Sequence, residues 1–162
     1  MHQQLPVQFI NQLTMIRIVY PVHTYKIREE AGKEIIFDEF RKIWVRLSPE
    51  EWVRQNFLHY LVEVKKYPAS LIAIEKEIRL GELKKRFDIL VYDGSHKPWM
   101  MIECKAMEIP LDEKVLQQVL RYNIALPVPF LVITNGIFVA GFQRKLMALE
   151  PIPELPDAGF LV

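Results

Sequence analysis

The residues of this sequence most able to do chemistry lie in two neighbouring segments, RFDILVYD and MMIECKA. Alternate residues of a strand share a face, so Glu103 and Lys105 are expected to point the same way. If residues 94–97 form the loop of an antiparallel hairpin, Asp88 lies opposite Glu103, with Cβ atoms about 5 Å apart. Two carboxylates at that distance repel unless a divalent cation lies between them or one of them is protonated.

A pair of carboxylates beside a lysine suits metal-assisted hydrolysis of a phosphodiester. Mg²⁺, or Mn²⁺ in its place, binds one or two carboxylates and keeps water and phosphate oxygens as its other ligands. Such an ion lowers the pKa of a bound water, which Lys105 would orient or deprotonate. The alternative is a solvated strand face with a cross-strand ion pair, the commoner use of these residue types. The position of Asp88 within an apolar strand favours a functional role, because central strands rarely carry charges without a reason.

The first strong helix pattern begins at the favourable N-cap Ser48 and is expected to end near residue 66. Glu51 occupies the third helical position and is expected to complete a capping box. Glu50 lies on the apolar stripe, so it is the better candidate for a third metal ligand, although stabilisation of the helix dipole explains it equally well. Arg54 lies on the same side and would pair with Glu50 or contact a phosphate. The stripe consists of Val53, Phe57, Leu61 and Val64.

A second helix is expected from the N-cap Asp112 to about Leu126. Gln118 and Tyr122 are four residues apart and fall on its predicted buried stripe with Val119. One interpretation is that Gln118 is a core-edge residue bonded to the backbone. The other is that Gln118 and Tyr122 reach the rim of the carboxylate site and contact a phosphate or a metal-bound water.

Lys84 and Lys85 belong to a short basic run ahead of the aspartate strand. Such a run is commonly a solvated turn, but it also suits contacts with backbone phosphates. Cys104 is expected to face away from Glu103 as a buried packing residue. No metal-ligand spacing links the four histidines, which are His2, His23, His59 and His96.

The chain has 162 residues, 51% of them hydrophobic and 25% charged, which is typical of one globular domain. The net charge of +1 excludes a strongly basic nucleic-acid-binding surface but leaves room for a locally basic groove. The single cysteine fits a reducing compartment. Prolines and an Asn-Gly pair interrupt the longest uncharged stretch, residues 122–143, so we expect buried strands, no membrane segment and a cytoplasmic protein.

The periodicity predicts an α/β (α+β) fold in which helices flank a central mixed sheet, in the order α-β-β-β-α-β-β. The expected strands span residues 72–79, 86–92 and 98–105, the run PFLVITNG, and residues 137–142. An earlier short hairpin is expected to turn at Ala31-Gly32-Lys33.

The pattern divides the chain into an N-terminal arm (1–24), a domain (25–145) and a proline-rich tail (146–162) that is expected to be irregular. The apolar stretch at 5–22 would support a homodimer.

The order of these elements and motifs resembles the PD-(D/E)XK nuclease superfamily. Several runs are more closely similar to the N-terminal nuclease domain of type I restriction enzyme R subunits and to small stand-alone proteins of that family. The similar runs, within about residues 25–142, are IIFDEFRKIWVRLSPEEWVRQNFLHYL, KKRFDILVYD, MMIECKA, QQVLRYN and FLVITNG. Phe87 stands where the motif has a proline, a departure that is common in the superfamily.

The resemblance implies a restriction-endonuclease-like core and a metal-dependent nuclease acting on DNA. Asp88 and Glu103 match the metal-binding acids of the superfamily, and Lys105 matches its motif lysine. Gln118 and Tyr122 match the Gln-xxx-Tyr motif of a subset of these nucleases.

A glutamate of the first helix often belongs to the site in this superfamily, which leaves Glu50 and Glu51 as alternatives. Type I R subunits also carry a helicase-like motor, and these 162 residues contain none. The resemblance therefore covers the nuclease module, and a partner subunit would supply recognition or motor activity.

Two other functions stay open. One is a non-catalytic module of the same fold that binds nucleic acid or docks on a protein, and the other is a structural domain whose charges form ion pairs. The net charge of +1 counts against tight autonomous binding to DNA. The presence of Asp88, Glu103 and Lys105 together counts against a decayed enzyme.

Overall fold

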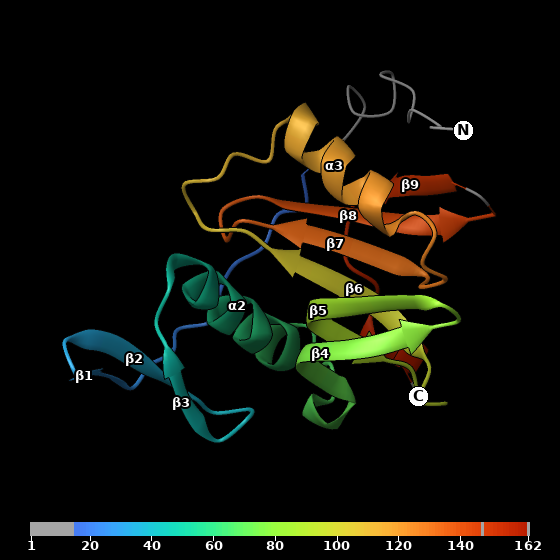
Figure 1. Cartoon of the computed structure of the whole chain (residues 1–162). Helices are drawn as coiled ribbons and strands as arrows, with labels where there is room; N and C mark the ends of the chain where they lie inside the picture. Colours follow the sequence, from blue (N-terminus) through green and yellow to red (C-terminus); the bar gives the residue numbers. More distant parts are fainter. Residues whose placement is uncertain (1–14, 147, 162) are drawn as a thin grey trace.

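The computed structural model describes residues 15–146 and 148–161, which form a small sheet, a large sheet and two α-helices (Figure 1). The small sheet consists of β1 (Ile27–Glu30), β2 (Lys33–Asp38) and β3 (Ile43–Arg46). The large sheet consists, in spatial order, of β4 (Ile72–Leu80), β5 (Leu83–Tyr92), β6 (Pro98–Cys104), β7 (Phe130–Thr134), β8 (Val139–Lys145) and β9 (Ala148–Ile152). The helices are α2 (Pro49–His59), which continues as a π-helical turn (Tyr60–Val64), and α3 (Glu113–Asn123). Short 3₁₀ turns cover Ala69–Leu71 and Ala158–Leu161.

The two helices pack on opposite faces of the large sheet. On β6, Met100 and Ile102 belong to the apolar cluster beneath α2, whereas Met101 belongs to the cluster beneath α3. This division follows from the alternation of side chains along a strand. Neighbours pair antiparallel except β6 and β7, which are parallel and are joined through α3. The expected mixed sheet flanked by helices is therefore confirmed.

The hairpin of β5 and β6 has the expected register. Ile89 pairs with Ile102 and Val91 with Met100, so the next step along both strands reaches Asp88 and Glu103. A bulge then shifts the register between Val91 and Tyr92, ahead of the turn.

The hairpin of β1 and β2 turns where the sequence predicts it. Ala31 and Gly32 both have positive φ, 50° and 75°. A two-residue turn of this kind matches the twist of its strands, and glycine adopts positive φ without steric cost.

Helix α2 begins at the predicted cap, because the Ser48 hydroxyl accepts a hydrogen bond of 3.0 Å from the Glu51 N–H. The second half of the expected capping box is wrong. The Ser48 N–H donates to the Arg46 carbonyl, and the Glu51 carboxylate instead forms ion pairs with arginines. Val53, Phe57 and Leu61 form the predicted buried stripe, but Val64 is 45% exposed because the last turn is π-helical and rotates it outward.

Helix α3 also begins at its predicted cap, Asp112, whose carboxylate accepts from the Val115 N–H at 3.0 Å. Its buried face differs from the predicted one. Gln118 and Tyr122 are exposed, because the helix presents a neighbouring stripe to the sheet. That stripe consists of Leu116, Val119, Leu120 and Asn123.

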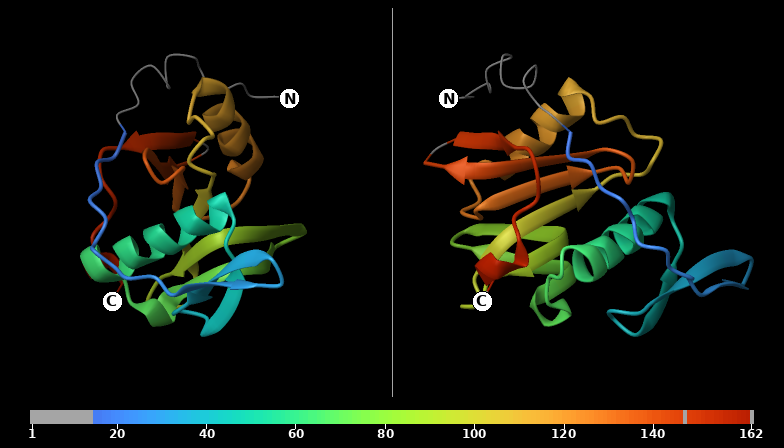
Figure 2. Two further views of the ribbon diagram at one scale, coloured as in Figure 1. Left: turned by 90° about the vertical axis from the view of Figure 1, so that its left-hand side faces the viewer. Right: turned by 180° about the vertical axis from the view of Figure 1, so that it is seen from behind.

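The segment that starts at residue 15 runs along the α2 side of the large sheet toward the small sheet (Figure 2). The Ile16 N–H donates to the Val139 carbonyl at 2.7 Å, and the Ile16 side chain is buried. Val19 and Val22 are exposed. Residues 1–14, which include most of the predicted arm, lie outside the described residues.

The expected irregular tail is wrong over Ala148–Ile152, which forms the edge strand β9 beside β8. Pro151 is compatible with this strand because an edge strand leaves one row of N–H groups unpaired. In the described part of the chain, no helix is long and apolar enough to cross a membrane.

Candidate active site

At Asp88, the side chains of β5 stop alternating regularly between the two faces of the sheet. Phe87 and Leu90 pack in the cluster beneath α3, whereas Ile89 packs in the cluster beneath α2. On the neighbouring strand, Glu75 has a φ of 51°, a conformation that non-glycine residues rarely adopt. This break in the alternation accounts for a half-buried carboxylate in the middle of an otherwise apolar strand.

The Asp88 carboxylate connects β6 to α2. Its Oδ2 atom accepts a hydrogen bond of 2.8 Å from the Cys104 N–H, and its Oδ1 atom lies 3.4 Å from Nη2 of Arg54. Cys104 itself is buried, as predicted. These two contacts hold the Asp88 carboxylate at the end of β6, next to Glu103.

Glu103 forms an ion pair with the neighbouring strand, in which Nζ of Lys85 lies 2.7 Å from its Oε1 atom. The Lys85 side chain is only 9% exposed. Burial raises the pKa of the Glu103 carboxyl above its ordinary value, the positive charge of Lys85 lowers it, and the adjacent negative charge of Asp88 raises it again. The structure therefore brings Asp88 and Glu103 together, as the hairpin register predicts.

A hollow of about 660 Å³ opens beside Glu103, between the end of β6 and α3. Lys105 lines it with Glu103, so the two residues do share a side. Gln118 and Tyr122 line it as exposed residues, and Nζ of Lys85 lies 4.1 Å from the centroid of the Tyr122 ring. The full lining is Lys85, Glu103, Lys105, Gln118, Val119, Arg121, Tyr122 and Asn123.

The first-helix glutamates occupy different surroundings. Burial raises the pKa of the half-exposed Glu50 carboxyl; the charge of Asp88 raises it further, and the charges of Arg54 and Lys105 lower it. Glu50 lines a different hollow from Glu103, together with Arg54 and Glu75, and Arg54 connects it to Asp88. Glu51 is buried, and its carboxylate accepts hydrogen bonds from Arg41, Arg54 and Gln55. Of the two, Glu50 has the less constrained carboxylate, which is more exposed and whose ion pair with Arg54 is 3.9 Å long.

Arg54 is 4% exposed and is surrounded by carboxylates. Besides Glu51, it contacts Glu75 at 3.3 Å, Asp88 at 3.4 Å and Glu50 at 3.9 Å, which includes the pairing with Glu50 considered from the sequence. In this arrangement the guanidinium positions the Asp88 carboxylate. Contact of Arg54 with a phosphate stays a prediction.

Lys84 and Lys85 diverge because successive residues of a strand point to opposite faces. Lys84 is exposed, forms an ion pair of 3.1 Å with Glu77, and lies outside the hollow that Lys85 lines. Of the two lysines assigned to substrate binding, the structure thus brings only Lys85 to the carboxylates.

The donors at this site fit a hard divalent cation. Asp88, Glu103 and Glu50 offer carboxylate oxygens, the ligands that Mg²⁺ and Mn²⁺ prefer. Burial is the main cause of the raised pKa values of Glu50 and Glu103, and repulsion from the negative charge of Asp88 raises both pKa values further. A divalent cation would relieve that repulsion.

The sequence interpretation missed two residues of the hollow and one cluster elsewhere. Arg121 follows Gln118 by three residues on α3, and that spacing is the signal that could have identified it. Asn123 lines the hollow without such a signal, because the helix ends there. His23 and His59 stack with ring centroids 3.7 Å apart, although their spacing in the sequence indicates no contact.

The mixed sheet between two helices, with carboxylates gathered from the middle of β5 and the end of β6, defines a restriction-endonuclease-like α+β domain. The family model of the type I restriction enzyme R protein N terminus matches residues 49–156, about two-thirds of the chain. The chain therefore belongs to this family, which confirms the resemblance noted in its sequence. No curated protein matches the chain.

Proposed function

We propose that this domain is a nuclease that hydrolyses DNA phosphodiester bonds with Mg²⁺ or Mn²⁺. The observation that carries the proposal is the meeting of Glu103 and Lys105 at one hollow, with Asp88 next to Glu103 and Arg54 in contact with both Asp88 and Glu50. Membership of the type I restriction enzyme R family supports it.

In this proposal Asp88, Glu103 and Glu50 hold the cation, which supplies an activated water and stabilises charge on the phosphate. Lys105 extends into the same hollow as Glu103, where its ammonium orients the attacking water and stabilises the developing anion. Arg54 keeps the Asp88 carboxylate in place through its contact of 3.4 Å.

The α3 side of the hollow would receive the DNA backbone. Gln118, Arg121 and Tyr122 are exposed along it and offer an amide, a guanidinium and a hydroxyl to phosphate oxygens. Lys85 and Lys105 add positive charge beside them. Because the whole chain has a net charge of only +1, we propose that a partner subunit or a second copy supplies further DNA affinity and recognition in the cytoplasm.

Cleavage of supercoiled plasmid and single-stranded DNA, with Mg²⁺ or Mn²⁺, tests the proposal. We expect wild type to nick DNA, and D88N, E103Q and K105A to lose about 100-fold or more of the rate. K84A, which alters an exposed lysine outside the hollow, is the matched control and should retain the rate. Equal cleavage by wild type and D88N would reject this active site.

One observation favours a second candidate function, a non-catalytic module that binds nucleic acid or a protein. Nζ of Lys85 lies 2.7 Å from Oε1 of Glu103 and supplies positive charge to that carboxylate from within the protein. Calorimetric titration with Mn²⁺ in the presence of DNA distinguishes the two. If wild type binds DNA but takes up no metal, the carboxylate pair is structural and the module is the better description.

A further inference from the structure

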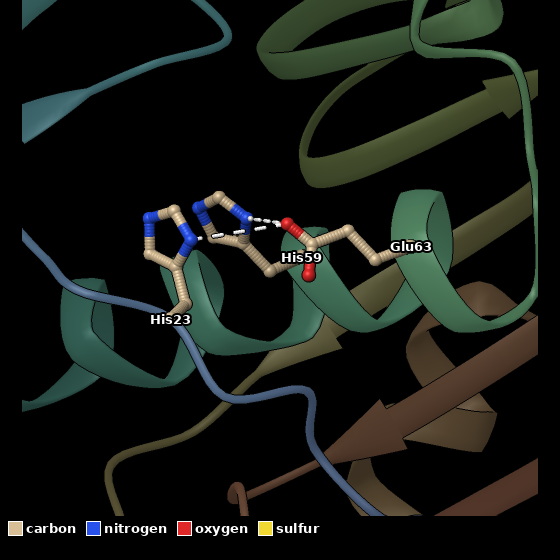
Figure 3. A group of neighbouring side chains, drawn as sticks. All are labelled: His23, His59 and Glu63. Atoms are coloured by element: carbon tan, nitrogen blue, oxygen red, sulfur yellow. Dashed lines mark hydrogen bonds and ion pairs between the residues drawn. The ribbon is translucent and has the colours of Figure 1, made fainter.

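A second cluster of potential metal ligands lies at the C-terminal end of α2, where His23, His59 and Glu63 converge (Figure 3). Their ligand atoms all lie within 4.8 Å of one another. Nδ1 of His59 lies 3.1 Å from Oε1 of Glu63, and Nδ1 of His23 lies 3.8 Å from the same oxygen. None of the three lines the hollow beside Glu103, so the cluster is separate from the candidate active site.

Local structure accounts for the convergence. His59 is the last residue of α2, and Glu63 follows four residues later in the π-helical turn, so both side chains lie on one side of the helix. His23 comes from the N-terminal segment that crosses this end of α2, and its ring stacks on that of His59 with an interplanar angle of 28°.

We propose that His23, His59 and Glu63 bind a transition-metal ion, for which Zn²⁺ is the best match. Imidazole nitrogens with one carboxylate suit Zn²⁺ and related borderline metals rather than Mg²⁺. Tetrahedral bonds of about 2.0–2.2 Å place neighbouring ligand atoms roughly 3.3–3.5 Å apart. The two separations at Glu63, 3.1 and 3.8 Å, bracket that value, and all three ligand atoms lie within 4.8 Å of one another. Coordination requires the two stacked imidazole rings to rotate toward a common point.

The surroundings of His23 also favour a cation. Oε1 of Glu63 lies 3.8 Å from its Nδ1 atom, and Oε1 of Glu39 lies 3.5 Å from its Nε2 atom, on the far side of the ring. Nε2 is buried and forms no hydrogen bond in the described structure. A metal ion bound at Nδ1 would make the ring a stronger donor at Nε2, and Glu39 is the carboxylate placed to accept that hydrogen bond and orient the ring.

The surroundings also favour a stable site. Tyr25 and Phe40 pack against the imidazoles, with ring centroids 4.6 Å from His23 and 4.9 Å from His59. His59 is buried, and His23 and Glu63 are half-buried. Three protein ligands leave a fourth position for water or another donor. An ion here would join the N-terminal segment to α2 and stabilise the folded chain in proportion to its affinity.

Zn²⁺ titration of the metal-free full chain by calorimetry, with Mg²⁺ as the comparison ion, tests the proposal. Absorption of a Co²⁺-loaded sample reports whether the coordination is tetrahedral. H23Q and E63Q remove one ligand each from half-buried positions. H96Q, which alters a histidine in an exposed turn, and D88N, which alters the candidate active site, are the controls.

We expect one tight Zn²⁺ per chain in wild type, H96Q and D88N, at least 100-fold weaker binding in H23Q and E63Q, and a loss of about 10–100-fold in E39Q. Zn²⁺ should also raise the thermal midpoint of wild type but not of H23Q, a comparison that holds even if H23Q is less stable. The proposal is overturned if wild type binds no Zn²⁺, if H23Q and E63Q bind it as well as wild type, or if D88N abolishes binding.

Discussion

The ammonium of Lys85 and the carboxylate of Glu103 lie 2.7 Å apart on the neighbouring strands β5 and β6, at the edge of the candidate active site. Both side chains are largely buried, and the same ammonium lies over the Tyr122 ring. Lys85 thus provides the positive charge that a metal ion would otherwise supply to Glu103. The free energy of unfolding of the metal-free domain should therefore depend on the charges of Lys85 and Glu103.

Replacing Lys85 with Met should destabilise the metal-free protein. The change leaves the Glu103 carboxylate buried without its cation, so we expect a loss of about 2–4 kcal/mol in the free energy of unfolding at pH 7.5. The loss should be smaller at pH 5, where Glu103, whose pKa is already raised, is more protonated. Saturating Mg²⁺ should restore part of the lost free energy of unfolding. Urea denaturation at both pH values, with and without Mg²⁺, measures these effects.

Lys84→Met is the matched control for that substitution, because Lys84 forms an exposed pair with Glu77. It should change the free energy of unfolding by less than about 0.5 kcal/mol. Equal losses in the two variants would contradict the importance of the buried pair.

Metal affinity should fall as the pH is lowered. The fall should begin at a higher pH than it would for carboxylates with ordinary pKa values. The pKa values of Glu50 and Glu103 are raised above 4.5, chiefly by burial, and metal binding requires both groups to be ionised. The folding stability of the metal-free protein should depend on pH in the opposite direction. A raised pKa in the folded state contributes stability below pH 4.5 that is lost as the pH rises through the folded pKa. Calorimetric Mn²⁺ titrations between pH 5 and pH 7.5 should show the loss of affinity on acidification.

Glu50→Gln provides the internal comparison for this pH dependence. It should weaken Mn²⁺ binding and make the remaining affinity less dependent on pH. Because Glu50 is half exposed, its effect on the stability of the metal-free protein should be a gain of no more than about 0.5 kcal/mol at neutral pH. Affinity that does not change between pH 5 and pH 7.5 would exclude these carboxylates as the ligands.

Replacing Asp38 with Asn should destabilise the domain strongly. Asp38 is fully buried and accepts hydrogen bonds from the backbone N–H groups of Phe40 and Arg41, from Nε of Arg41 at 2.5 Å and from Gln55 at 3.0 Å. The substitution leaves the Arg41 guanidinium without one of its carboxylates, so we expect a loss of about 3–5 kcal/mol by urea denaturation at pH 7. Glu150→Gln, which breaks an exposed pair with Lys145, should cost less than about 0.5 kcal/mol.

Asp38 should also set part of the acid sensitivity of the fold. Burial raises its pKa, but the hydrogen bonds from Arg41 and Gln55 outweigh burial, and the net pKa is lowered from 3.8. A lowered pKa in the folded state contributes stability above pH 3.8 that is lost as the pH falls through the folded pKa. Stability measured between pH 5 and pH 2 should therefore fall more steeply in wild type than in D38N. Parallel profiles would show that other groups control acid unfolding.

Replacing Gly141 with Ala should overpack the contact between β8 and the N-terminal segment. An added Cβ would lie 2.7 Å from Cδ1 of Ile16 and 2.9 Å from Cγ1 of Ile152. We expect a loss of about 1–3 kcal/mol in stability. Gly159→Ala, whose Cβ would meet nothing within 4 Å, should be close to neutral in the same denaturation assay.

A double-mutant cycle tests the mechanism of that loss. Ile16→Val removes the Cδ1 atom that the new Cβ would approach, so G141A should cost less in the I16V background than in wild type, by roughly 0.5–1 kcal/mol. Additive effects would indicate that the clash with Ile16 is not the cause.

Local rules in the sequence were enough for the framework of the site. Ser48 and Asp112 cap their helices because a short polar side chain satisfies a free N–H of the first turn. The β5–β6 turn, together with the period of two along a strand, places Asp88 beside Glu103. These features depend on neighbours within one turn or one hairpin, and the sequence alone predicts them. The buried face of α3 was mispredicted. The helical periodicity places Gln118 on the buried face, but the packing of the helix against the sheet leaves Gln118 exposed.

Contacts between distant segments were decided only in the tertiary structure. The sequence does not indicate that Lys85 would pair with Glu103 while its neighbour Lys84 would not, because that depends on which face of β5 turns toward α3. Nor does spacing indicate that His23 would stack on His59, since the two residues lie far apart in the sequence and meet only where the N-terminal segment packs on α2. The sequence by itself determined the residue types and local geometry of the carboxylate site. The fold determined which charges compensate one another, because electrostatic interactions depend on distance and burial, and both are properties of the packed chain.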